Sequence, residues 1–104
     1  MPDDAVQKWR ALVDANPRNE LATYSLAKAY FDRQEWSPAA DFFERAIALK
    51  ADWMLAHILR GKALLKLGRG DQAKTSFERA LQLAIEQHHE GPEEEVREIL
   101  ADLE

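Results

Sequence analysis

A four-residue phrase occurs twice in this 104-residue chain, and its spacing limits the folds that the chain can adopt. Residues 43–46 read Phe-Glu-Arg-Ala, and residues 77–80 repeat the phrase 34 positions later. Placing residues 20–53 over residues 54–87 without a gap gives ten identical pairs, among them Leu21 with Leu55 and Lys28 with Lys62. A fixed period of this length is typical of stacked repeats, so the chain is expected to fold as a row of similar units.

Each repeat has the sequence pattern of two helices. Apolar residues at helical spacing predict first helices over residues 20–34 and 53–67 and second helices that start near Ser37 and Asp71. Ser37, Asp71 and also Asp3 are N-cap residue types that lie 34 positions apart, and Asp52 is a further N-cap candidate. Gly68 is expected to end a helix in the left-handed conformation. The second helices are predicted to run to about Lys50 and His89.

Both ends of the chain add a helix to the two repeats. Residues 3–15 have the pattern of a second helix whose first helix is missing, since Ala5 and Trp9 are in phase with Ala39 and Phe43. At the other end, Gly91-Pro92 is expected to break the preceding helix, and residues 93–104 are predicted to form a last one. Its apolar stripe consists of Val96, Ile99, Leu100 and Leu103.

The pattern resembles the tetratricopeptide repeat, a 34-residue pair of helices with small and aromatic residues at fixed places. The residues that carry the resemblance are Leu26, Ala27, Tyr30, Ala39, Phe43 and Ala46 in one repeat, and Arg60, Gly61, Leu64, Ala73, Phe77 and Ala80 in the other. The resemblance implies an all-α fold, a right-handed superhelical stack of antiparallel helix pairs with about six helices. We expect a single domain over residues 1–104, comprising a half repeat (3–19), two repeats (20–53 and 54–87) and a capping segment (88–104).

Composition excludes several classes of function. The chain has no cysteine, and therefore no disulfide and no thiolate chemistry. It shows no secretory signal and no apolar run long enough for a bilayer, so the cytoplasm is the expected location and a membrane is not an expected partner. Residues 88–104 contain seven acidic residues and a single arginine or lysine, Arg97, whereas the rest of the chain is almost neutral. Without a dominant basic face, nucleic acid is not expected as a partner.

No arrangement of residues predicts catalysis. His88 and His89 are adjacent and point about 100° apart on a helix, while His57 belongs to another helix, so a metal site is not expected. Gly68-Arg69-Gly70-Asp71 lacks the lysine and the spacing of a phosphate loop and is interpreted as a turn. The sequence therefore predicts a protein that is not an enzyme and has no cofactor.

The resemblance implies that the first helix of each repeat lines a concave groove that binds a protein or peptide. Lys28 and Lys62 are then expected to lie side by side and to form, with Lys66, a basic strip suited to a carboxylate among apolar side chains. An alternative is that these lysines only keep an exposed face soluble. The predicted groove residues are Leu21, Tyr24, Lys28, Phe31, Leu55, Ile58, Lys62 and Lys66.

That groove departs from the chaperone-binding carboxylate-clamp subclass of the family. Tyr24 stands where the subclass has lysine, Lys28 stands where it has asparagine, and a third repeat is absent, so membership of the subclass is rejected.

The two ends offer alternatives to the groove. Self-assembly into a homodimer is the second hypothesis, through a face of residues 3–15 that would present Val6, Trp9, Leu12 and Val13. The last helix is expected to cap the stack, with its apolar stripe on the helix of residues 77–83 and its glutamates in water. Other roles for it are exchange between protomers, or competition for the basic strip as an acidic helix.

Overall fold

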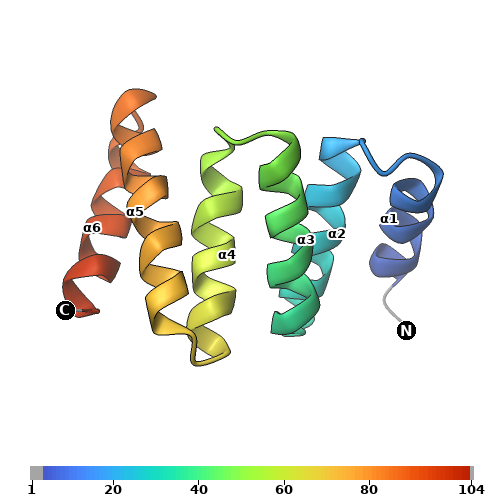
Figure 1. Cartoon of the computed structure of the whole chain (residues 1–104), viewed down its shortest axis with the longest axis horizontal. Helices are drawn as coiled ribbons and strands as arrows, with labels where there is room; N and C mark the ends of the chain where they lie inside the picture. Colours follow the sequence, from blue (N-terminus) through green and yellow to red (C-terminus); the bar gives the residue numbers. More distant parts are fainter. Residues whose placement is uncertain (1–3, 104) are drawn as a thin grey trace.

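A computed structural model of the chain describes residues 4–103, which form six helices and no strand. The helices are α1 (Asp4–Ala15), α2 (Glu20–Asp32), α3 (Trp36–Leu49), α4 (Met54–Lys66), α5 (Gly70–Glu86) and α6 (Glu90–Asp102). They stand side by side in chain order along the longest axis of the molecule (Figure 1), which measures 38 × 27 × 22 Å. The expected all-α solenoid is confirmed.

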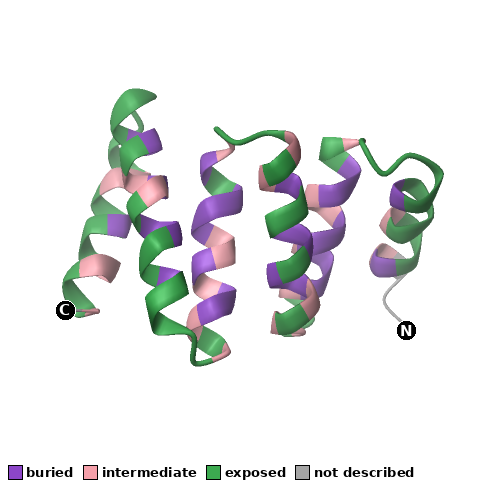
Figure 2. Cartoon of the chain, in the orientation of Figure 1, coloured by how far each residue is buried: buried purple, intermediate pink, exposed green. Residues whose placement is uncertain are grey.

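The core lies between successive helices, and the repeated phrase supplies much of it. Phe43 and Phe77 are fully buried, as are the alanines three positions after each of them, Ala46 and Ala80. The intervening glutamates and Arg45 are exposed and Arg79 is half-buried. Buried residues therefore form stripes on the facing sides of the helices, with exposed residues between them (Figure 2). The phrase is a packing element, as the sequence indicates.

Three of the helix connections share one tight geometry. Gln34, Gly68 and His88 each follow a helix by two positions and adopt positive φ values of 61°, 75° and 59°. The amide after each of them donates to a carbonyl five residues earlier, as in Glu35 N to Tyr30 O at 3.0 Å. This is the Schellman motif, in which a left-handed residue reverses the chain and satisfies the last carbonyls of a helix. The expectation for Gly68 is confirmed.

These turns determine where the next helix begins, and the predicted side-chain caps are wrong. The residue after each turn is itself the N-cap, so α3 follows Glu35 and α5 follows Arg69, and neither cap side chain accepts a hydrogen bond. Ser37 and Asp71 consequently lie inside the first turn of their helices. Trp53, rather than Asp52, is the N-cap of α4. Asp3 lies outside the described residues.

The break before the last helix also lies earlier than the sequence indicates. α5 ends at Glu86 rather than near His89, and the chain reverses at residues 87–89. Gly91 and Pro92 belong to the first turn of α6, where proline is tolerated because the first amides of a helix have no partner within it. The Schellman turn at His88 replaces the expected break at Gly91-Pro92.

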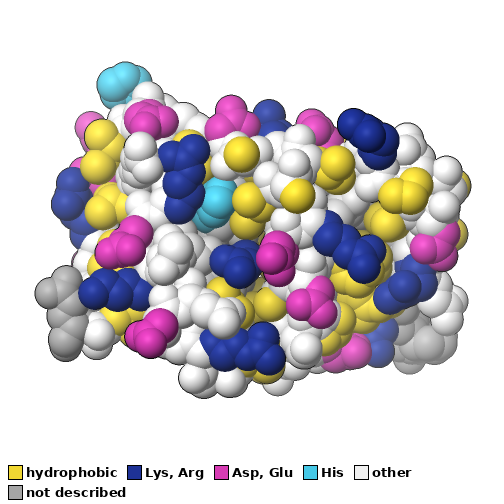
Figure 3. All heavy atoms as spheres, in the orientation of Figure 1, with side chains coloured by type: hydrophobic (Ala, Val, Ile, Leu, Met, Phe, Trp, Pro, Cys, Tyr) yellow, Lys and Arg dark blue, Asp and Glu magenta, His cyan; other side chains and the backbone are white. Residues whose placement is uncertain are grey.

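α6 packs against α5 through its predicted apolar stripe. Val96 is fully buried, and Ile99, Leu100 and Leu103 are partly buried against the core. This is the packing expected of a capping helix. No helix within residues 4–103 is long and apolar enough to cross a membrane. On the face in Figure 3, basic and acidic side chains are interspersed rather than separated by sign.

A buried histidine in α4 makes stability depend on pH. His57 Nε2 donates to Ala51 O at 2.9 Å, and burial lowers the pKa of His57 below its usual 6.5 despite that hydrogen bond. Below about pH 6.5 the unfolded chain therefore binds a proton that the folded chain resists, so the free energy of unfolding falls as pH falls through this range. Above it, the histidine is neutral in both states.

We expect His57→Thr to weaken this dependence. Thr23 occupies the corresponding place in α2, where its Oγ1 donates to Asn19 O at 2.8 Å, so threonine is a residue that the repeat already accommodates. Thermal unfolding at pH 7.5 and 5.5 is the measurement, and the drop in Tm should be larger for wild type than for the variant. Equal drops would show that His57 does not titrate on unfolding.

Candidate partner-binding groove

The first helices of the two repeats, α2 and α4, present the most exposed pair of equivalent apolar residues. Leu21 and Leu55 are each the second residue of their helix and are 59% and 47% exposed. The amino-terminal ends of α2 and α4 lie along the same edge of the stack, at the top in Figure 1. Two leucines of the predicted groove are thus available for contact with another molecule.

An aromatic pair connects the two helices beside these leucines. The Tyr24 ring stacks on Trp53 with ring centroids 4.2 Å apart and an interplanar angle of 16°, and it meets Phe43 edge-on at 5.6 Å. Burial of the Tyr24 phenol raises its pKa. The repeat pattern predicts Tyr24 as a groove residue but misses Trp53; its place two residues before Leu55 could have pointed to it. The pair fixes the N-terminus of α4 against α2.

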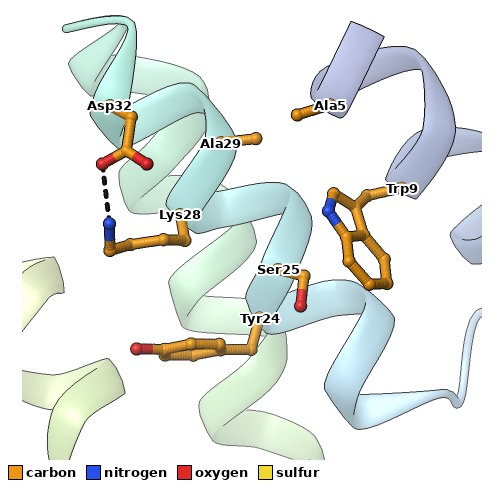
Figure 4. Close-up of a pocket in the computed structure, with 7 residues that line it drawn as sticks. All are labelled: Ala5, Trp9, Tyr24, Ser25, Lys28, Ala29 and Asp32. Atoms are coloured by element: carbon orange, nitrogen blue, oxygen red, sulfur yellow. Dashed lines mark hydrogen bonds and ion pairs between the residues drawn. The ribbon is translucent and has the colours of Figure 1, made fainter.

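On the other side of α2, a hollow of about 210 Å³ opens between α2 and α1 (Figure 4). Trp9 of α1 lies on one side of it, and Ser25, Lys28 and Tyr24 of α2 lie on the other. The remaining lining residues are Ala5, Ala29 and Asp32. Trp9, a residue of the predicted dimer face, is therefore part of the wall of this hollow.

A second hollow lies beside the N-terminus of α4, where Leu55 is exposed. Its volume is about 460 Å³, and Gln87 Nε2 donates to Asp52 O at 3.0 Å across it. It is lined by Lys50, Asp52, Trp53, Met54, Leu55, Gln87 and His89. In the described part of the chain, no three histidine or carboxylate side chains converge as metal ligands would.

The three predicted lysines are all engaged by other side chains. Lys28 Nζ lies 2.7 Å from Asp32 Oδ1, one turn along the same helix. Lys62 Nζ lies 2.7 Å from an α6 carboxylate, Glu95 Oε2. Lys66 Nζ lies 5.8 Å from the centre of the Trp36 ring. The lysines therefore have separate partners rather than forming one uncompensated basic strip.

Two of the predicted apolar groove residues, Ile58 and Phe31, are less exposed than Leu21 and Leu55. Ile58 is only 2% exposed, so its assignment to the groove surface is wrong; its branched side chain is too short to emerge where the equivalent Tyr24 does. Phe31 is half-buried, with its ring edge-on to Trp36 at 5.1 Å. Leu21, Leu55 and Lys66 are exposed, whereas Tyr24, Lys28 and Lys62 are half-buried, as Phe31 is.

The uncovered face of α1 is smaller than the sequence suggests. Val6 and Val13 are buried, because they lie on the side of α1 that packs against α2. Their assignment to an exposed dimer face is wrong. Trp9 is half-buried and Lys8 Nζ lies 5.0 Å from the centre of its ring. Leu12, 42% exposed, is the large apolar residue of α1 that stays open to solvent.

Models of the tetratricopeptide repeat match residues 2–52 and residues 54–86. The chain belongs to the tetratricopeptide repeat family. Mouse DnaJ homolog subfamily C member 3 is 35% identical over 78 residues, which are 75% of this chain and 16% of that protein. The chain thus spans about a sixth of the length of this curated relative.

Two solved structures, the first of them a tetratricopeptide repeat domain, resemble the whole stack. The first such domain of Spaghetti (RPAP3), bound to the HSP90 peptide SRMEEVD, is 30% identical with a TM-score of 0.81 and covers 97% of this chain and 79% of that one. PcrH in complex with the chaperone binding region of PopD has a TM-score of 0.91 at 20% identity, covering 97% and 77% of the two chains. The second likeness concerns the fold alone.

The outer side of α6 differs from the sides of α2 and α4 on which a second helix packs. The eighth residue of α2 is Ala27 and that of α4 is Gly61, and both lie buried where a second helix packs on the first. The eighth residue of α6 is Arg97, which is exposed and pairs with Glu93 at 2.9 Å. The outer side of α6 therefore carries an exposed charged side chain at the place where α2 and α4 carry a small buried residue.

Proposed function

We propose that the chain is a non-catalytic interaction module that holds a segment of a partner protein against α2 and α4. Members of the tetratricopeptide repeat family related to this chain bind peptides, as the Spaghetti domain with its HSP90 peptide does. The observation that carries the proposal is the exposure of Leu21 and Leu55 at equivalent places on neighbouring first helices. Solvent-exposed leucines at one surface are suited to burial against a partner.

The chemistry around the leucines favours an extended segment of mixed character. Tyr24 and Trp53 supply an aromatic surface between them, and Lys28 and Lys62 supply cationic groups on the same two helices. Each lysine already binds a carboxylate at 2.7 Å, which indicates the kind of group that such a position accepts. A partner with apolar side chains around an acidic one fits this combination.

The competing hypothesis of self-assembly is supported by a smaller exposed apolar surface. Two of its four residues, Val6 and Val13, are buried within the stack, and Leu12 is one exposed side chain rather than a patch. Stable dimers usually bury a contiguous apolar core. We therefore favour partner capture over homodimer formation.

We expect the double variant Leu21→Ala, Leu55→Ala to weaken partner capture about thirty-fold. Burying half of each leucine contributes about 1 kcal/mol, so that the loss of both corresponds to about 2 kcal/mol. The measurement is quantitative affinity capture from the native lysate, followed by titration of the captured partner. Because both side chains are exposed, Tm should stay close to that of wild type.

Ile85→Ala is the matched control for this experiment. Ile85 is 46% exposed, as Leu55 is at 47%, but it lies near the C-terminal end of α5. A partner lost only from the leucine double variant supports the groove. Equal capture by wild type and the leucine double variant, or equal loss from the Ile85 variant, would remove the support for it.

A further inference from the structure

One ion pair joins the second groove helix to the capping helix. Lys62 Nζ of α4 and Glu95 Oε2 of α6 lie 2.7 Å apart, and the two side chains are 38% and 48% exposed. The residues are 33 positions apart, so the contact exists only because α6 packs at the end of the stack. The lysine that the sequence places in the groove thus already holds a carboxylate.

The two equivalent lysines differ in where their carboxylates come from. Lys28 pairs with Asp32, one turn along its own helix, so that carboxylate always stays close to it. In α4 the place of Asp32 is taken by Lys66, which leaves Lys62 with a like charge one turn away. Lys62 obtains its carboxylate from another element instead. Of the two positions, Lys62 is the one whose partner can be exchanged.

Exchange at Lys62 needs only a change in one side chain. α6 is fixed by Val96, which is fully buried, whereas the neighbouring Glu95 reaches α4 over the surface. An ion pair this exposed contributes little to stability, because water solvates and screens both charges. Glu95 can therefore rotate into solvent while α6 remains packed on α5.

We propose that Glu95 is the resident occupant of a carboxylate-binding position at Lys62, and that an acidic side chain of the partner segment takes its place. This inference rests on the proposed function and specifies the chemistry of the partner. Glu95 then determines specificity: a neutral residue of the partner cannot replace it at Lys62, whereas an aspartate or glutamate can.

The test uses synthetic tetrapeptides with leucines three positions apart, about 10 Å when extended. The first probe is acetyl-Leu-Ala-Glu-Leu-amide and the second is acetyl-Leu-Ala-Gln-Leu-amide. A third, acetyl-Leu-Ala-Gln-Leu with a free C-terminal carboxylate, distinguishes a side-chain carboxylate from a terminal one. Dissociation constants are measured by NMR titration of wild type, Glu95→Gln, Lys62→Gln and Glu93→Gln.

Glu95→Gln should bind the glutamate peptide about three-fold more tightly than wild type, the range of one exposed ion pair. It should bind both glutamine peptides as wild type does, and Lys62→Gln should show no preference for glutamate. Glu93→Gln is the matched control, since it removes an ion-paired carboxylate of the same helix that pairs with Arg97 instead. It should leave all affinities unchanged.

The inference is overturned if Glu95→Gln binds the glutamate peptide no more tightly than wild type, if Glu93→Gln gives the same gain, or if the gain appears only with the terminal carboxylate. Absence of any peptide binding also overturns it. The proposed function is judged separately by the leucine variants and native partner capture. The groove can therefore stand while the role of Glu95 fails.

Discussion

Gly61→Ala is expected to lower the free energy of unfolding by about 1–3 kcal/mol, although alanine is the better helix former. A Cβ added at Gly61 would lie 2.7 Å from Cζ of Phe77, and 2.8 and 2.9 Å from two further atoms of that ring. Phe77 is fully buried, so the ring cannot move aside without disturbing the core. The helix propensity gained is worth only about 0.5–1 kcal/mol. The steric penalty therefore exceeds the gain in helix propensity, and Gly61→Ala is expected to be less stable than wild type.

Thermal and urea unfolding measure this effect, at roughly 4–8 °C in Tm for each kcal/mol in a chain of this size. Gly70→Ala is the control, because nothing lies within 4 Å of a Cβ placed there. A double-mutant cycle with Phe77→Leu tests the cause: the smaller side chain should absorb part of the penalty, so the two changes should not be additive. Additive effects, or a Gly61→Ala variant as stable as wild type, would contradict the steric explanation.

The close approach at Gly61 is also why so much of the fold can be predicted from sequence. Close packing of a second helix on a first one requires a small residue opposite the aromatic ring, as Gly61 is to Phe77. The equivalent positions 34 residues earlier hold another small residue and another aromatic one, Ala27 and Phe43, and both are fully buried. The recurrence alone is enough to identify the family, the helix pairs and most of the core. Packing constraints of this kind leave a strong sequence signal because few residues satisfy them.

Helix ends leave a weaker signal, and they account for the main errors. Gln34 and His88 adopt the left-handed conformation that usually requires glycine, so neither position stands out in the sequence as Gly68 does. The tight turns start α3 and α5 earlier than the N-cap residue types Ser37 and Asp71 suggest, and they start α6 earlier than Gly91-Pro92 suggests. Among the starts of α2 to α6, a side chain caps only α2, where Asn19 Oδ1 accepts from Ala22 N at 3.0 Å after the looser connection between α1 and α2.

The sequence predicts where residues of the candidate site lie on the helices, but not which side chains contact each other. Leu21 and Leu55 are exposed at equivalent places, as the repeat spacing indicates. Burial of Ile58 depends on how far its side chain extends, and the stacking of Tyr24 on Trp53 depends on how the α3–α4 connection folds back. The contact of Lys62 with Glu95 requires the exact placement of a helix that lies outside the repeats. Such contacts between elements need three-dimensional information.

Val96→Asp is expected to have the largest effect on the fold, a loss of at least about 3 kcal/mol of stability or a tendency to aggregate. Val96 is fully buried between α6 and α5, and a carboxylate there would have neither water nor a cation to compensate it. α6 would separate from α5 and leave Leu83 and neighbouring core residues open to solvent. Thermal unfolding and light scattering measure the two outcomes.

Ala101→Asp is the control for Val96→Asp, because it distinguishes the loss of α6 packing from the effect of an added negative charge. It adds the same charge to the same acidic helix at an exposed position, where substitutions usually change stability by less than about 0.5 kcal/mol. If both variants melt alike, burial of Val96 is not what holds α6 and the capping role is contradicted. If only Val96→Asp is destabilised, the cap also fixes where Glu95 lies, since the two residues are consecutive. Val96 would then position the carboxylate that occupies Lys62, which links the stability of the stack to the availability of its groove.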